Sequence, residues 1–277
     1  MELLASPFAV DLVAGFAVPI PIQVICEFLG VPHADRDLLH GWSEVLVSGW
    51  QRDREEVARA FDDLGAYFGE LVAHKRRHPA ADLLTELVNV YDNSDRLTTF
   101  ELIRLATALV IVGHETCANQ ISMFTLALLR HPRQLDGLRT HLDLLPAAVE
   151  ELLRFVPISG GAGALIRVAT QDVELDGTTI GAGEAVIPAV SAANRDPHLF
   201  AQPDVLDLGR HGPSHFTFSA GFHACVGASL ARIELQEALL ALLTRIPETL
   251  HLAVPESELR CKPQLTLRSL EALPLAW

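Results

Sequence analysis

Paired cysteines are the first feature that this sequence lacks. Its four cysteines, Cys26, Cys117, Cys225 and Cys261, lie far apart and form no Cys-x-x-Cys pair. This spacing argues against a disulfide framework and against a zinc ribbon. It also gives no reason to place the protein in an oxidising compartment.

Basic residues are also few. Lys and Arg number 21 against 35 Asp and Glu, which gives a formal net charge of −14. Such a chain lacks the broad basic surface that neutralises phosphates, which argues against general nucleic-acid binding. A small local basic patch for a protein partner stays open.

The N-terminal segment lacks a targeting pattern. Residues 1–30 are apolar but have no basic stretch at their start, and Asp11, Pro19 and Pro21 interrupt them. This pattern fits neither a signal peptide nor a membrane span. We therefore expect a cytoplasmic protein that makes no use of a membrane.

Internal repeats, low-complexity runs and obvious linkers are missing as well. The 277 residues are 49% hydrophobic and 20% charged, a balance typical of a globular chain with a large core. We predict a single domain over residues 1–277.

Helical patterns dominate the chain. Residues 55–75 place Val57, Phe61, Leu64, Phe68 and Leu71 at helical spacing. Residues 99–130 form a long, mostly apolar candidate helix that ends before His131-Pro132. Because this helix is apolar nearly all round, we expect it to run through the core.

Two further helices and a small β region complete the pattern. Helices are expected from Pro146 to Phe155 and from about Val226 to Ile246. Between them, short apolar runs within residues 164–187 are separated by Asp176-Gly177 and by a second glycine-rich turn. The sequence thus predicts a mainly α fold with a small β region.

The segment 218–227 carries the clearest chemistry. A glycine-rich loop delivers Cys225 to the start of a helix, where backbone N–H groups and the positive helix terminus stabilise a thiolate. Gly221 and Gly227 lack side chains, so a flat cofactor could approach the backbone closely. The local pattern alone also allows a buried structural cysteine, which is the commoner role of a single Cys.

The loop resembles the haem-binding loop F-G-x-G-x-H-x-C-x-G of cytochromes P450. Ser219 stands where the family usually has its first glycine. The resemblance implies haem b, with the Cys225 thiolate as the iron ligand. The matching positions are Phe218, Gly221, His223, Cys225 and Gly227.

The segment 112–117 resembles the family's A/G-G-x-D/E-T signature, which implies a position on the distal face of the haem. Gly113 would then make room for dioxygen, and Glu115 and Thr116 would be the catalytic residues that manage protons and oxygen. Val112 replaces the usual small residue. Alternatively, Thr116 bonds back to a helix carbonyl and both polar side chains are merely satisfied inside the helix.

A third segment, Glu151 to Arg154, matches the family's ExxR pair. The i, i+3 spacing places both charges on one helix face, which by itself usually means a weak surface ion pair. The resemblance implies instead a buried pair joined by Arg210, with a structural role. It also assigns Arg167 and His223 to the haem propionates.

The resemblance covers nearly the whole chain in the family's order. It begins in mid-fold, so it implies an N-terminally truncated cytochrome P450 fold, its C-terminal two-thirds, with apolar faces exposed or rearranged. The implied activity is a haem-dependent monooxygenase that acts on a small organic substrate and O₂. A ferredoxin and a ferredoxin reductase are the expected electron donors.

Two alternatives accompany this interpretation. The chain could be a catalytically inactive P450-like auxiliary or remnant that binds a partner protein. A nucleotide-binding enzyme that uses the glycines of 161–163 or 181–183 is the weaker alternative, because neither string completes GxGxxG. In the cytochrome P450 interpretation, the resemblance implies that residues 157–163, which follow the ExxR helix, line the substrate side.

Overall fold

The computed structural model divides the chain into two compact units. One comprises residues 12–118, and the other comprises residues 1–11 and 119–277. The prediction of a single domain stays a prediction. The structure describes residues 9–48, 52–93, 98–157, 166–212, 214–262 and 267–277.

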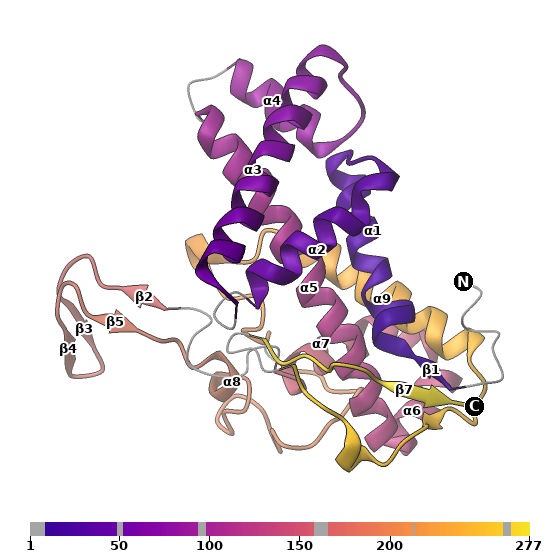
Figure 1. The fold of residues 1–277 in the computed structure, drawn as a ribbon. Coiled ribbons are helices and arrows are strands. Elements are labelled where there is room, and N and C mark those ends of the chain that lie inside the picture. The colour runs from indigo at the N-terminus through magenta and orange to yellow at the C-terminus, as the bar shows by residue number, and fades with distance from the viewer. Residues whose placement is uncertain (1–8, 49–51, 94–97, 158–165, 213, 263–266) are drawn as a thin grey trace. The chain divides into compact units, whose positions relative to one another are not determined.

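Helices make up the unit of residues 12–118 (Figure 1). Helix α2 packs against α3, and α3 packs against α4. The core of this unit contains the fully buried Leu29, Leu39, Leu64 and Phe68. Its helices are α1 (Pro19–Leu29), α2 (Arg36–Val47), α3 (Arg54–Arg77), α4 (Leu83–Asp92) and the first part of α5 (Thr99–Arg130).

The ends of these helices follow from local sequence signals. Asp53 caps α3 by accepting a hydrogen bond from the Glu55 N–H at 3.2 Å, and Asp82 caps α4 in the same way. Helix α1 ends at Gly30, whose φ of +67° is the left-handed conformation that glycine adopts readily. The helix predicted for residues 55–75 is confirmed as α3.

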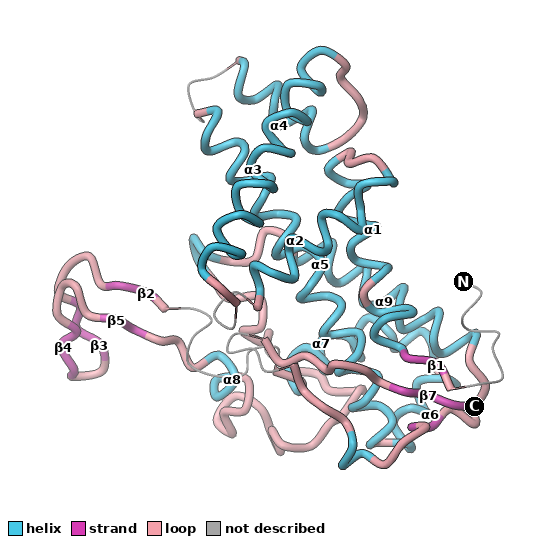
Figure 2. The backbone as a smooth tube through the Cα atoms, in the orientation of Figure 1, coloured by secondary structure: helices cyan, strands magenta, loops and turns pink. Residues whose placement is uncertain are grey.

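The unit of residues 1–11 and 119–277 combines helices with short strands and long loops (Figure 2). Its helices after α5 are α6 (Pro132–Thr140), α7 (Leu145–Phe155), α8 (Val190–Ala193) and α9 (Ala228–Arg245). Its strands are β1 (Val10–Asp11), β2 (Arg167–Val168), β3 (Val173–Leu175), β4 (Thr178–Ile180), β5 (Ala185–Val186), β6 (His251–Leu252) and β7 (Pro274–Ala276).

All strand pairs in the described residues are antiparallel. Strands β1, β7 and β6 form one sheet in that order, while β2 pairs with β5 and β3 pairs with β4. The β3–β4 turn has positive φ at Asp176 and at Gly177, as a tight hairpin turn requires. The predicted β region is therefore confirmed.

Helix α5 has the predicted bounds but not the predicted surroundings. Its part from Cys117 onward is almost entirely buried. Its first part has an exposed apolar face, since Phe100, Leu105 and Val112 are 69%, 36% and 56% exposed. The expectation that the whole helix runs through the core is wrong, because apolar composition alone does not show which side chains find neighbours.

The remaining sequence features fall in turns or outside the described residues. Residues 181–183 form the turn between β4 and β5 and open no helix. Residues 158–165, which include the glycines of 161–163 and most of the expected substrate-side segment, lie outside the described ranges. Within those ranges, no helix combines the length and the apolar character needed to cross a membrane.

Candidate functional site: the Cys225 loop and the α5 signature

The Cys225 loop is closed by backbone hydrogen bonds just before α9. The Cys225 N–H donates to the Phe218 carbonyl at 2.8 Å, and the Ala228 N–H donates to the Cys225 carbonyl at 3.3 Å. The reversal between them uses positive φ at Ser219 (61°) and Gly221 (69°). Ser219 thus adopts the left-handed conformation at the position where the P450 motif has a glycine.

The surroundings of Cys225 fit a flat apolar cofactor that carries iron. The cysteine is exposed, and a Cβ built on Gly221 or on Gly227 would meet no atom within 4 Å. The neighbouring Phe222 and Val226 side chains are also exposed, which gives an apolar surface around the thiol. A haem face could therefore lie against the loop backbone with the thiol as its axial ligand.

The other cysteines fit an iron ligand less well. Cys26 and Cys117 are buried. Desolvation by burial raises the pKa of Cys26 to about 11, which disfavours the thiolate that would ligate iron. Cys261 is exposed but follows no glycine-rich loop.

Helix α7 holds the segment that leads into the Cys225 loop. The Thr217 hydroxyl donates to the Leu153 carbonyl at 2.7 Å. Asn194 donates to Thr217 Oγ1 at 2.9 Å and accepts from the Phe216 N–H at 2.7 Å. The loop that presents the thiol is thus tied to a core helix immediately before Phe218.

Glu151, Arg154 and Arg210 meet in one buried ion-pair network. Arg154 donates to both carboxylate oxygens of Glu151, with Nε–Oε2 at 2.7 Å and Nη2–Oε1 at 2.8 Å. Arg210 Nε lies 3.0 Å from each of the same oxygens. The Glu151 and Arg154 side chains are each 2% exposed. The pair is therefore buried and is not the weak surface ion pair that i, i+3 spacing by itself usually indicates.

The network also fixes the chain between residues 194 and 210. Arg154 Nη1 donates to the carbonyls of Asn194 and Pro203, at 2.8 and 2.9 Å. Arg210 Nη2 donates to the Val205 carbonyl at 2.9 Å. Because these acceptors lie on irregular backbone, the two guanidinium groups replace the hydrogen bonds that a helix or sheet would provide.

A second charge cluster lies beside the loop and was not foreseen from the sequence. Arg232 Nε and Nη2 donate to Glu150 at 2.6 and 3.0 Å, and His215 Nε2 donates to the same carboxylate at 3.2 Å. The Arg232 guanidinium also stacks on the Phe218 ring, 4.5 Å from its centroid. This cluster links α7, the loop and α9.

The pKa values in this cluster show how its charges interact. Burial alone would raise the pKa of Glu150, but hydrogen bonds from His215 and Arg232 hold it at about 2. The pKa of Arg232 is raised, first by its hydrogen bond to Glu150 and further by the negative charges of Glu150 and Cys225. Arg232 therefore lies within electrostatic reach of the Cys225 thiolate. The only sequence signal is its position about one turn into α9, the helix that follows Cys225.

The residues expected at the propionates lie in the same unit as Cys225. Arg167 is half-buried on β2 and donates to the Ile166 carbonyl at 3.3 Å. His223 is exposed in a short helical turn, Gly221–His223. Within the described ranges neither side chain takes part in an ion pair. The guanidinium group of Arg167 and the imidazole ring of His223 are therefore available to bind a carboxylate.

The α5 signature belongs to the other unit, and its residues have definite partners there. The Thr116 hydroxyl donates to the Val112 carbonyl at 2.9 Å, which is the back-bonding that the sequence left open. Glu115 is buried, and its Oε1 lies 3.6 Å from His114 Nε2. A Cβ on Gly113 would lie 2.8 Å from Ile25 Cγ1. In this structure, the missing side chain of Gly113 allows α1 to pack closely against α5.

Comparisons with known proteins all point to the same protein family. The family model "Cytochrome P450" matches residues 43–247. Nocardicin C N-oxygenase of Nocardia uniformis subsp. tsuyamanensis is 45% identical over 267 residues, which are 96% of this chain and 66% of that protein. Pentalenic acid synthase of Streptomyces avermitilis is 46% identical over 267 residues, 96% of this chain and 65% of that protein.

Solved structures give the same result. The LnmA cytochrome P450 hydroxylase of Streptomyces atroolivaceus superposes with a TM-score of 0.92 at 44% identity, covering 100% of this chain and 73% of that one. The putative thioether synthase SgvP gives a TM-score of 0.94 at 41% identity, covering 100% and 70%. The chain spans about two thirds of the length of the curated relatives named above. It belongs to the cytochrome P450 family, whose members bind haem through a cysteine thiolate.

Proposed function

We propose that this chain binds haem b through Cys225 and acts as a monooxygenase. It inserts one atom of O₂ into a small organic substrate, with electrons from a ferredoxin and a ferredoxin reductase. The observation that carries the proposal is the exposed thiol of Cys225 on a glycine-flanked loop, at the start of α9. The names of the relatives, an N-oxygenase and a hydroxylase among them, support oxygenation as the reaction class.

The proposed roles divide between the two units. Haem held there would supply the oxygen chemistry, because a thiolate ligand donates electron density to iron and favours O–O cleavage. Cys225 would ligate the iron, and Phe218, Gly221 and Gly227 would form the loop surface beside it. Arg167 and His223 would bind the propionates. The buried network of Glu151, Arg154 and Arg210 keeps the loop in place.

On α5 we propose that Glu115 holds a proton for delivery and that Thr116 donates a hydrogen bond within the oxygen-binding space. The hydroxyl of Thr116 is half-buried and its donor is engaged with Val112. A rotation about its χ1 angle would release this donor at the cost of one hydrogen bond, about 1 kcal/mol. Glu115 is kept buried beside His114, away from bulk water.

The test of the iron ligand is a spectrum of the haem-reconstituted protein. The reduced carbon monoxide complex should show the band typical of a thiolate ligand, and Cys225→Ser should abolish it. Cys261→Ser is the matched control, because Cys261 is also exposed but has no glycine-rich loop. A thiolate band that survives in Cys225→Ser would refute the assignment.

The test of the α5 residues is the coupling of electron use to product formation. Thr116→Ala should divert reductant to hydrogen peroxide, because the donor that guides oxygen cleavage is gone. Thr125→Ala is the matched control, since Thr125 makes the same back-bond on the same helix, to the Ile121 carbonyl at 2.8 Å. Equal coupling in the two variants would remove Thr116 from the mechanism.

A further inference from the structure

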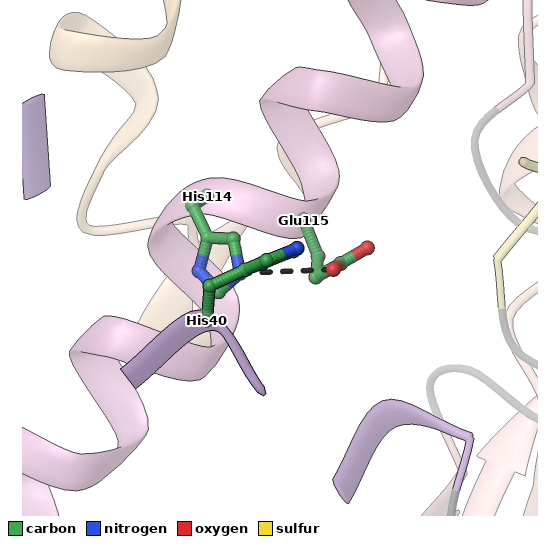
Figure 3. Close-up of side chains that lie close together, drawn as sticks. All are labelled: His40, His114 and Glu115. Atoms are coloured by element: carbon green, nitrogen blue, oxygen red, sulfur yellow. Dashed lines mark hydrogen bonds and ion pairs between the residues drawn. The ribbon is translucent and has the colours of Figure 1, made fainter. Parts of the chain in front are cut away.

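Three side chains that can ligate metal converge inside the unit of residues 12–118. His40 comes from α2, while His114 and Glu115 are neighbours on α5 (Figure 3). One ligand atom from each lies within 4.8 Å of the other two. His114 and Glu115 are buried and His40 is half-buried, so the cluster lies in the protein interior with one member reaching towards solvent.

The hydrogen bond from His114 to the Val110 carbonyl fixes which ring nitrogen carries the proton. His114 Nδ1 lies 2.7 Å from the Val110 carbonyl, which can only accept. Nδ1 therefore carries the proton, and Nε2 of the neutral ring presents its lone pair. That Nε2 lies 3.4 Å from His40 Nδ1 and 3.6 Å from Glu115 Oε1. Nε2 is thus the His114 atom that approaches both of the other ligand side chains, which converge with it in Figure 3.

These separations match those around a tetrahedral metal ion. With Zn–N and Zn–O bonds of about 2.0–2.2 Å, two ligand atoms on one tetrahedral ion lie roughly 3.3–3.6 Å apart. The two separations from His114 Nε2, 3.4 Å to His40 Nδ1 and 3.6 Å to Glu115 Oε1, agree with this range. The third separation, between His40 and Glu115, is at most 4.8 Å, so a shift of the order of 1 Å would bring it to the tetrahedral distance.

We propose that His40, His114 and Glu115 form a binding site for a divalent transition-metal ion of the zinc type. Two imidazoles and one carboxylate favour Zn²⁺, Co²⁺, Ni²⁺ or Cu²⁺ over Mg²⁺ and Ca²⁺, which prefer oxygen ligands. The Val110 carbonyl orients His114, as an outer hydrogen bond commonly does for a metal-bound histidine. Three protein ligands leave a fourth position open.

The site has a consequence for turnover that rests on the function proposed above. Glu115 is the residue proposed to deliver protons. A carboxylate that is bound to a metal ion cannot take up a proton at the same oxygen, so metal binding should slow turnover reversibly. All three ligands belong to residues 12–118 and none of them is proposed to ligate haem, so metal binding can be measured without haem present.

The direct test measures metal binding by the full-length chain. Zn²⁺ is titrated by calorimetry, and Co²⁺ is titrated by the intense visible absorption that low-symmetry coordination gives. His40→Gln is the informative variant, because glutamine still offers a hydrogen-bond donor to His114 but not an imidazole ligand. We expect one site in the wild type and a loss of affinity of about 100-fold or more in His40→Gln.

A surface histidine pair supplies the control. His74 and His78 lie one turn apart at the exposed end of α3, with ring centroids 4.8 Å apart, and could bind metal ions weakly. The double variant His74→Ala, His78→Ala should keep the site of highest affinity. Cys225 is present in every variant, so its contribution cancels in the comparison.

The outcomes separate the site from the proposed function. Equal affinity and stoichiometry in the wild type and in His40→Gln would overturn the metal site. Loss of binding in the His74, His78 double variant instead would overturn it as well. If metal binds through His40 but turnover is unaffected, the site stands and the proton-delivery role of Glu115 fails.

Discussion

Replacing Arg154 should be far more damaging than replacing Arg210, although both contact the same carboxylate. Arg154 is 2% exposed in its side chain, and all three of its guanidinium nitrogens are engaged. The guanidinium carbon also lies over the Phe200 ring, 5.1 Å from the ring centroid. Arg154→Ala therefore removes five hydrogen bonds. It leaves the buried carboxylate of Glu151 with Arg210 as its remaining charged partner.

The magnitude follows from what each change leaves behind. Breaking a buried ion pair by removing one partner costs about 3–5 kcal/mol. Arg154→Ala should approach this range, because Glu151 keeps only Arg210 as a charged partner and the carbonyls that Arg154 Nη1 holds lose their donor. Arg210→Ala leaves the bidentate pair of Glu151 and Arg154 intact, and Arg210 itself is 12% exposed, so we expect about 1–2 kcal/mol. The two variants should thus differ by about 2 kcal/mol or more.

Urea unfolding of the wild type and the two variants measures this difference. A net stability of about 5–15 kcal/mol leaves Arg154→Ala close to unfolding in the worst case, so Arg154→Lys is the second variant. Lysine keeps the charge but cannot form the two-pronged pair with Glu151, and should fall between the wild type and Arg154→Ala. A larger loss in Arg210→Ala than in Arg154→Ala would refute this reasoning.

Three further predictions use the same unfolding assay. Ser219→Gly should stabilise the protein by about 1 kcal/mol, because Ser219 has a φ of +61°, which glycine adopts without strain. The matched control Ala220→Gly lies at an extended φ of −152° and should destabilise the protein, so equal effects of the two changes would contradict backbone strain at Ser219. Gly113→Ala should destabilise the protein by about 1–2 kcal/mol, because the new Cβ would clash with Ile25. Adding Ile25→Ala to this variant should recover part of the lost stability. If the effects of the two changes on unfolding free energy are strictly additive, the contact between Gly113 and Ile25 is not the cause. The pKa of Glu150 is lowered from 4.5 to about 2, so the stability that its carboxylate contributes is complete above pH 4.5 and is lost as the pH falls towards 2. In Glu150→Gln the loss of unfolding free energy over this pH range should be smaller by about 1 kcal/mol, a figure reduced for screening because the side chain is 40% exposed. Parallel plots of unfolding free energy against pH for the wild type and the variant would disprove this prediction.

The helices were predictable because their signals are local. The bounds of α5 follow from an apolar periodic stretch that ends before His131-Pro132, and Gly30 ends α1 in the left-handed conformation. The hairpin at Asp176-Gly177 follows from turn chemistry in the same way. What the sequence did not show is burial, as the exposed first part of α5 demonstrates.

The candidate site was predictable only where a motif names the residue. Cys225, Glu115 and Arg154 stand in such motifs. Arg232 and His40 do not, because their importance comes from contacts with residues 82 and 74 positions away in the chain. Contacts at such separations depend on how whole helices pack, which residue spacing cannot reveal.

The attachment of the Cys225 loop to α7 limits how far this loop can be treated as a module. Thr217 depends on a carbonyl of α7, and Arg232 depends on a carboxylate of the same helix. A designer who moved residues 215–232 into another scaffold would transfer the iron ligand but leave its supports behind. A functional graft would have to include α7 as well, so the smallest transferable unit for haem ligation is a pair of helices with the loop between them.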